Sequence, residues 1–561
     1  MSKLSRRRFI QIAGSGATAL GIGMRFPQGA WAQKGTAQKS KKDVDSRWEE
    51  WEFYYPNKYD SEDTKVLKEF QAELDEVNKK GKGFKVDDLI SGKLSGMDAG
   101  SGPGGRGTKI TWENILKNAN TYLPSNPLFT DKEYAKKSRF GNPIAWPLIS
   151  SLEVMPAMPK TKGIGDYMVV SAHNDTNSYF KPFYEGDTLY SITVEQHCTD
   201  ITPSEGSYYR TFCMSGKAKV YNQKGELVGE AANVLKESFR RYKDKSKRNK
   251  SGAHAWESPD WWTRPAYQYT DKDWDNIIGM WKKENVRGKE PLYWDEVKVG
   301  DQPTPTSVFF VMETQGDIAM SVPQFSVDIK KNVLEPKVFK TMVKNAQGIW
   351  VLPEYKEKKA RGAGGPGGGM PDMPGGGEMP AGGQGDQQGP GGQGSGGQQG
   401  TGGGMPGGEQ IMEQPQELAN RDGRALVQNS LAAKFAAGMI TDWMGDAGWL
   451  QRVHWDIMEL PPGSQDYIDF TAYPTVIPPI PDELRPDLFD KYPYMDKVPF
   501  MRGCRAAWHC MEGDLIISKA YVTKKYNIGS DYFVDLTWWC HTYDNYLIEE
   551  GSATVKLPKK A

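Results

Sequence analysis

The chain has 561 residues, more than one ordinary domain holds. Its 71 basic and 71 acidic residues give a formal net charge of zero, which points away from nucleic acid or an anionic membrane surface as the main partner. The six His and five Cys are scattered without a CxxC pair, and no GxGxxG fingerprint follows a predicted strand. We therefore expect neither a metal site nor a cofactor.

The N-terminal residues have the features of an export signal peptide. Consecutive arginines in residues 5–10 precede an apolar pair, a weakly apolar run follows over residues 10–24, and Ala30-Trp31-Ala32 offers small residues for a signal peptidase. This pattern is typical of a bacterial twin-arginine signal, with a short basic start before an ordinary helix as the alternative. We expect cleavage after Ala32 and a periplasmic mature protein. The run over residues 10–24 is too short and too glycine-rich for a stable membrane span, and no other stretch reaches membrane-spanning length.

Residues 33–109 precede the first predicted domain. Residues 33–50 are polar and indicate a flexible leader. Apolar positions at helical spacing among many charges predict a surface helix within residues 51–80. Glycines over residues 100–107 indicate a linker.

The first domain is predicted over residues 110–250. Residues 110–120 predict a helix with Thr111 as its N-cap, and a second short helix begins near Asp131. Alternating apolar residues then predict strands, joined by a hairpin turn at Asn222-Gln223-Lys224-Gly225; these strands cover residues 188–195, 208–221 and 226–231. A helix followed by antiparallel strands that could wrap it indicates an α+β design.

An aromatic-rich connector, residues 251–289, leads to a second domain over residues 290–558. Two insertions interrupt it: a Gly/Met/Gln/Pro tract at 361–413, expected to be disordered, and an irregular Pro- and Tyr-rich segment at 461–500. The remaining elements are an apolar helix over 425–443, a strand at 453–457, and closing strands at 515–524, 532–541 and 552–557.

Several segments together resemble the MaoC-like dehydratases with a double hot-dog fold. In the first half these are residues 126–131, which begin Asn-Pro-Leu, followed by Tyr134-Ala135 and by residues 140–145. In the second half they are residues 290–301 and the Thr-Asp-Trp-Met-Gly-Asp segment at 441–446. The resemblance implies an α+β tandem hot-dog fold, with antiparallel sheets each wrapped around a central helix. Such sheets usually pair, so the two halves would form a pseudo-dimer, and homodimerisation stays open.

The resemblance also implies a chemistry. Family members add water to an acyl thioester or remove it, and an Asp and a His on one segment share the proton transfer. Here the Asp position falls on Pro124 and the His position on Phe129, and neither residue can move a proton. In the second half the insertion replaces the segment that would hold the His, and another frequent His position falls on Gly438. The usual pair is therefore lost or relocated.

Three residues could have taken over the acid–base work: Asp442, Asp446 and His454. The two Asp are four residues apart and would share a face if the helix continued that far. Two such carboxyls can divide acid and base roles. Alternatively, one closes the helix while the other is solvated. His454 follows in an alternating strand beside Trp455, where it is either a base or a packed residue.

Two functions remain open. One is a periplasmic hydro-lyase, a hydratase or dehydratase, acting on a hydrophobic small molecule not linked to coenzyme A, since coenzyme A thioesters are cytoplasmic. The 18 Trp and 26 Tyr fit an apolar pocket and a filled core equally well. The other is a non-catalytic hot-dog subunit, a binding or assembly protein exported with a partner. A redox enzyme has only the export route in its favour.

Overall fold

The structure is a computed structural model. It describes residues 61–94, 107–149, 167–200, 210–241, 267–309, 343–344, 350–351, 426–427, 429–456, 479–484, 510–511 and 514–560. The predicted signal, the leader, the insertion at 361–413 and most of the segment at 461–500 lie outside the described residues. Among the described helices, none is long and apolar enough to cross a membrane.

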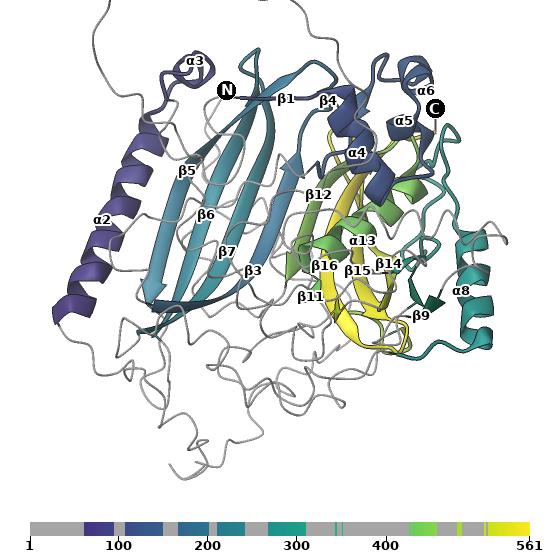
Figure 1. Ribbon diagram of the computed structural model, residues 1–561. Coiled ribbons are helices and arrows are strands. Elements are labelled where there is room, and N and C mark those ends of the chain that lie inside the picture. The colour runs from purple at the N-terminus through teal and green to yellow at the C-terminus, as the bar shows by residue number, and fades with distance from the viewer. Residues whose placement is uncertain are drawn as a thin grey trace, which may run out of the picture. The chain divides into compact units, whose positions relative to one another are not determined.

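One ten-stranded sheet organises the described chain, in the order β1-β5-β6-β7-β3-β12-β16-β15-β14-β8 (Figure 1). The first five strands come from the N-terminal half: β1 Thr108–Lys109, β3 Tyr167–Tyr179, β5 Thr188–Asp200, β6 Arg210–Asn222 and β7 Leu227–Arg241. The other five come from the C-terminal half: β8 Thr306–Phe309, β12 Trp449–Asp456, β14 Leu515–Ile528, β15 Asp531–Thr542 and β16 Leu547–Leu557.

The two halves repeat the same topology. In each half a short first strand lies at the outer edge, the second strand in sequence lies at the junction, and three antiparallel strands fill the space between them. The halves meet where β3 pairs antiparallel with β12, with Thr176 opposite His454. This repeated order confirms the predicted α+β tandem hot-dog fold.

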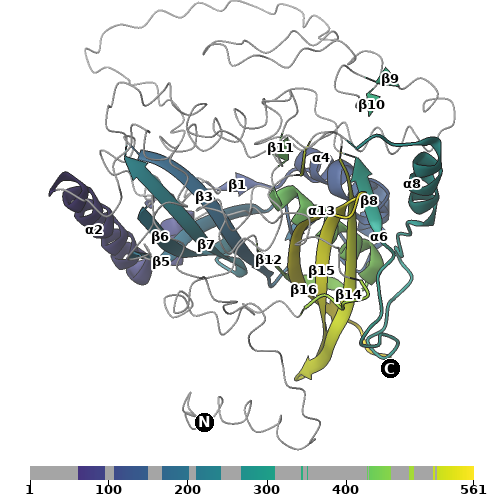
Figure 2. The ribbon, with the colours of Figure 1, turned by 90° about the horizontal axis from the view of Figure 1, so that it is seen from below.

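The C-terminal half-sheet wraps helix α13, Asn429–Met444, which packs on β12, β14, β15 and β16 (Figure 2). Its buried face includes Ala432, Ala433, Ala436 and Ala437, whose small side chains let the strands approach closely. The helix ends because Gly445 adopts a φ of 68°, the left-handed conformation that favours glycine after a helix C-terminus.

Three helices of the N-terminal half lie beside α13: α4 Trp112–Tyr122, α5 Pro127–Thr130 and α6 Lys132–Lys137 (Figure 1). The end of α4 touches α13 at Gly438, where an added Cβ would stand 2.8 Å from the Tyr122 carbonyl oxygen. A glycine is therefore required for this close approach. No His side chain fits at this position without separating the two helices.

Helix α2, Ser61–Gly83, packs along β5. The Asn78 side chain donates to the Gln196 carbonyl and accepts from the Gln196 N–H, both at 2.6 Å, which satisfies two backbone groups of this strand. A strand edge whose N–H and C=O groups are occupied in this way is protected against pairing with another chain.

The predicted local elements are largely confirmed. Thr111 caps α4 by accepting from the Asn114 N–H, and Asp131 caps α6. Gly225 in the predicted hairpin turn has a φ of 76°. The closing strands form as expected, but β14 and β5 extend beyond their predicted ends, since each is paired along its length with a neighbouring strand.

Candidate functional site

The candidate site lies where the α5–α6 segment of the first half meets the turn that follows α13. Asn126, the N-cap of α5, accepts a hydrogen bond from the Leu128 N–H at 3.1 Å, which fixes its side chain. Its amide nitrogen then donates to Asp442 Oδ1 at 2.8 Å. The asparagine of the family-like Asn-Pro segment thus joins the two halves of the chain.

Asp446 stands in the turn that Gly445 begins. The Asp446 N–H donates to the Gly288 carbonyl at 2.9 Å. Arg139 holds the turn from the other side, donating to the carbonyls of Asp446 at 2.8 Å and of Gly448 at 2.7 Å. The main chain around Asp446 is therefore fixed by three hydrogen bonds.

The Asp446 carboxyl group is buried, with 7% of the residue exposed. The Tyr134 hydroxyl donates to Oδ2 at 2.6 Å. The other oxygen, Oδ1, is buried and has no hydrogen-bond partner within the described part of the chain. A buried acceptor of this kind is costly unless a water molecule or a ligand satisfies it.

Burial raises the pKa of Asp446, and the hydrogen bond from Tyr134 and the charge of Arg139 oppose that effect. Burial and the same hydrogen bond raise the pKa of Tyr134 to about 12, so Tyr134 stays protonated and acts as a donor. Asp446 is thus held closer to its neutral, proton-donating form than an exposed carboxyl would be.

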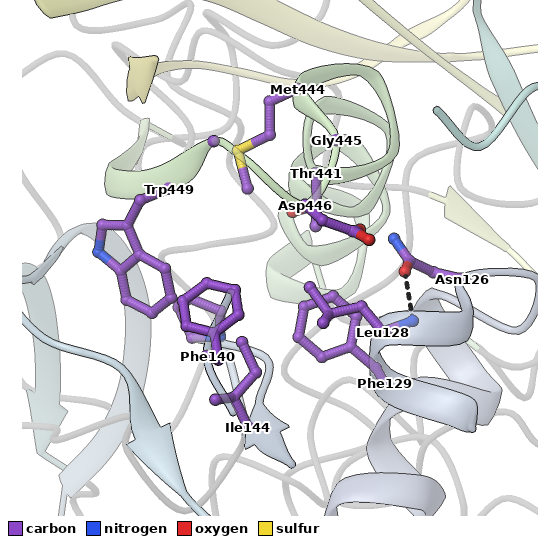
Figure 3. Close-up of a pocket in the computed structure, with 12 residues that line it drawn as sticks. Asn126, Leu128, Phe129, Phe140, Ile144, Thr441, Met444, Gly445, Asp446 and Trp449 are labelled. Atoms are coloured by element: carbon purple, nitrogen blue, oxygen red, sulfur yellow. Dashed lines mark hydrogen bonds between the residues drawn. The ribbon is translucent and has the colours of Figure 1, made fainter. Parts of the chain in front are cut away.

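Asp446 borders a small cavity (Figure 3) with a volume of about 10 Å³, enough for one water molecule. Figure 3 draws Asp446, Asn126 and Leu128 on one side of it, and Trp449, Phe140 and Ile144 on the other. Most of the wall is apolar. The lining residues are Asn126, Leu128, Phe129, Phe140, Ile144, Pro147, Thr441, Met444, Gly445, Asp446, Gly448 and Trp449.

The structure separates the three residues that the sequence proposed. Asp446 lines the cavity. Asp442 lies in the last turn of α13 and binds Asn126, outside the cavity wall. The condition for the two carboxyls to share a helical face is not met, because α13 ends at Met444. His454 lies in β12, 3% exposed, with Nδ1 at 2.7 Å from the Thr176 hydroxyl across the junction of the half-sheets.

Phe129, which occupies the position of the family's missing histidine, lines the cavity. It is 2% exposed, so a buried aromatic ring stands where the resemblance would place a base. Tyr134 and Arg139 were not predicted as site residues. The only sequence signal for Tyr134 was its place in the family-like Tyr-Ala pair. Across the described residues, no group of three or more His, Cys, Asp or Glu is arranged to hold a metal ion.

Comparison with family models gives one match. Residues 100–231 match the FAS1-like dehydratase domain region. This stretch includes α4 to α6 and β3, β5 and β6, with the Asn126 segment and Tyr134. Together with the repeated strand order, the match supports a hot-dog fold of the hydratase and dehydratase kind. No curated protein matches the sequence.

Solved structures are similar at low identity. A MaoC domain protein dehydratase from Chloroflexus aurantiacus J-10-fl is 10% identical, with 81% of this chain and 93% of that chain covered and a TM-score of 0.36. A Mycobacterium tuberculosis protein described as having a double hotdog fold is 8% identical, with 80% and 93% covered and a TM-score of 0.33. A MaoC-like dehydratase from Rhodospirillum rubrum is 24% identical, with 24% and 88% covered and a TM-score of 0.19.

Proposed function

We propose that the protein is a hydro-lyase that adds water to, or removes it from, an apolar substrate not linked to coenzyme A, with Asp446 as the group that moves the proton. One observation carries the proposal. A buried carboxyl group keeps one oxygen bound to Tyr134 and presents the other, unpartnered among the described residues, beside an apolar cavity large enough for a water molecule. A raised pKa suits such a group to donate a proton.

The reaction balances with this carboxyl group alone. In the hydration direction, neutral Asp446 gives its proton to one carbon of a C=C bond. A water oxygen bonds to the neighbouring carbon, and the proton that this water loses returns to the carboxylate. Since Tyr134 donates to Oδ2, the transferable proton belongs on Oδ1. Dehydration is the same sequence in reverse.

Aromatic side chains around the cavity support this chemistry. Phe129, Phe140 and Trp449 line it. The faces of aromatic rings attract positive charge, which develops on the carbon skeleton when a proton adds to an alkene. Among the described residues that line the cavity there is no lysine or arginine; the Arg139 guanidinium lies behind the Phe140 ring.

Export from the cytoplasm favours a substrate that is not linked to coenzyme A, because coenzyme A thioesters are cytoplasmic. The arginines at positions 6–8 and the Ala30-Trp31-Ala32 site favour secretion to the periplasm by the twin-arginine route. A free alkene, alcohol, terpenoid or steroid-like compound would then be the substrate. N-terminal sequencing of the secreted protein tests the location, and a mature chain that begins at Gln33 is the expected result.

The function is tested by incubating the mature protein with apolar alkenes, including terpenoids and steroids, in ¹⁸O-labelled water and following the label by mass spectrometry. Asp446→Asn is expected to lose about 10²- to 10⁴-fold in rate, the usual contribution of a positioned acid or base. Asp442→Asn is the matched control, since it lies near the same helix end but outside the cavity wall, and it should lose much less. An Asp446→Asn enzyme as active as wild type would contradict the proposal.

A second candidate is a non-catalytic subunit that binds or assembles with a co-exported partner. It is favoured by Pro124 and Phe129 at the family's acid–base positions and by the small volume of the cavity. Purification from the native periplasm separates the two. A constant stoichiometric partner and no activity in the labelled-water assay would support the subunit, whereas activity of the lone chain would favour the hydro-lyase.

A further inference from the structure

A cavity that holds one water molecule must open before an organic substrate can reach Asp446. Eleven of the twelve lining residues are buried, among them Leu128, Phe129, Ile144 and Trp449. Phe140 is the exception, since among the described residues of the wall it alone is partly exposed. The shortest change that connects the cavity to solvent is therefore a movement of the Phe140 ring.

Phe140 lies on a turn whose neighbouring residues are exposed, while its ring packs against the core. It lies in the turn between α6 and β2 (Ile144–Ala145), where the Gly141 N–H donates to the Ser138 carbonyl at 3.1 Å. Gly141 has a φ of 70°, and no atom lies within 4 Å of where its Cβ would be. A ring on a solvated turn can change its side-chain rotamer without leaving a buried polar group unpaired.

The ring of Phe140 occupies a defined slot. The Arg139 guanidinium carbon lies 4.4 Å from the ring centroid, and the Trp449 ring centroid lies 6.2 Å away at an interplanar angle of 56°. Both neighbours are held independently of Phe140. Arg139 donates to two carbonyls of the Asp446 turn, and the Trp449 indole N–H donates to the Tyr179 carbonyl at 2.8 Å. The slot therefore persists when the ring leaves it.

We infer that Phe140 is the gate and the specificity residue of the Asp446 site: its ring turns outward, and a planar unsaturated group of the substrate takes its place between Arg139 and Trp449. A cationic guanidinium and an indole face both favour a flat π system over a saturated group of the same size. The inference rests on the proposed function only for the identity of the reacting group, Asp446. The opening itself is independent of any activity.

Methionine oxidation by hydrogen peroxide reports the opening directly. Met444 lines the cavity and is 4% exposed, whereas Met439, five residues earlier in α13, is 3% exposed and lies outside the wall. Oxidation rate follows exposure, so peptide mass spectrometry of Phe140→Ala should show Met444 oxidised about tenfold faster or more, with Met439 unchanged. Equal acceleration of both would mean general unfolding and would overturn the gate, as would no acceleration of Met444.

Leu128→Ala is the matched control. Leu128 also lines the cavity but is buried, with 4% exposed, so its truncation enlarges the cavity without opening it. Met444 should then be oxidised near the wild-type rate, and acceleration equal to that in Phe140→Ala would refute Phe140 as the gate. The oxidation rate should also be unchanged in Asp446→Asn, so the gate and the proposed reaction can fail separately.

Benzene probes the slot. In Phe140→Ala, added benzene should slow Met444 oxidation severalfold because it fills the vacated place, while cyclohexane at equal activity protects less. Equal protection by both would remove the preference for planar groups, and no protection by either would show that the slot does not accept a substrate group.

Discussion

At the residue scale, the stability contributed by a carboxyl group buried beside an apolar cavity changes with pH in the opposite sense from that of a carboxyl held in a salt bridge. Burial raises the pKa of Asp446 above that of the unfolded chain, about 3.9. The folded state therefore binds this proton more tightly. The stability that the group contributes is complete at low pH and is lost as the pH rises from the unfolded pKa through the folded pKa.

This sign gives a testable stability difference. Asp446→Asn cannot ionise and can still accept from Tyr134, so its free energy of unfolding relative to wild type should increase as the pH rises from about 4 and should level off above the folded pKa. Urea denaturation of both proteins across this range measures the difference. Asp482→Asn, at an exposed Asp, controls for the loss of one negative charge. A difference that decreases with rising pH would show that the carboxyl is stabilised as an anion.

At the scale of elements, the contact between α4 and α13 depends on one glycine. Besides the close approach at Gly438, the contact includes the Tyr122 and Phe435 rings, whose centroids lie 5.1 Å apart. The Lys434 Nζ lies 5.7 Å from the centroid of the Tyr122 ring. The contact holds α4, which leads directly into Asn126 and α5, against the helix that ends at the candidate site. Small errors in this packing would therefore misplace Asn126 relative to Asp442.

Gly438→Ala should destabilise the protein by about 1–3 kcal/mol, the usual cost of forcing extra volume into a packed contact. The added Cβ meets a backbone oxygen, which cannot turn away as a side chain would. Gly279→Ala in α8 (Asp271–Lys283) is the control, since nothing lies within 4 Å of its Cβ position; it should stabilise by about 0.5–1 kcal/mol through helix propensity. Denaturant unfolding measures the free energy of unfolding of both variants. Equal changes in this free energy would contradict the steric explanation.

At the scale of the whole sheet, the junction between β3 and β12 makes the two halves one structure. The pairing runs from Arg452 opposite Ser178 to Asp456 opposite Asn174. The side-chain bond from His454 to Thr176 adds a buried polar contact across the same junction. His454 is therefore placed to join the halves, a role that its position in an alternating strand did not reveal.

Thr176→Val keeps the shape of the side chain but removes this hydrogen bond. Because the bond is buried, the expected loss in the free energy of unfolding is about 1–3 kcal/mol. Thr523→Val removes a partly buried bond to the Asp535 carbonyl inside the C-terminal half and should cost less, about 0.5–1.5 kcal/mol. Thermal unfolding should stay one transition in both variants. Two separated transitions would show that the halves are independently stable.

Local sequence patterns were sufficient for elements that short-range physics decides. Thr111 as an N-cap, the glycine turn after Asn222 and the alternation in the closing strands all act over a few residues, and all three are confirmed. The helix predicted over 425–443 is α13, which begins at Asn429 and ends at Met444; Leu426–Val427 form the short strand β11 instead. Gly445 in the Met-Gly-Asp sequence was the available signal, since glycine commonly follows a helix C-terminus.

The site was only partly predictable. Asp446 was named from the sequence, but its partner Tyr134 lies 312 residues away along the chain, and Arg139 lies 307 residues away. No spacing rule connects residues so far apart. The proposed pairing of Asp442 with Asp446 assumed a continuing helix, whereas the chain turns at Gly445 and gives each carboxyl a different partner from the first half.

The sequence by itself determined several helices, most of the long strands and the tandem hot-dog resemblance, because caps, turns and apolar periodicity act locally and leave a readable pattern. It did not indicate β3, β8 or helix α8. Only the tertiary structure decided which of three candidate residues borders a cavity, that Phe140 is the partly exposed part of its wall, and that His454 joins the half-sheets. These facts follow from burial and from contacts between distant segments. Such contacts depend on how the two halves pack, which no local pattern encodes.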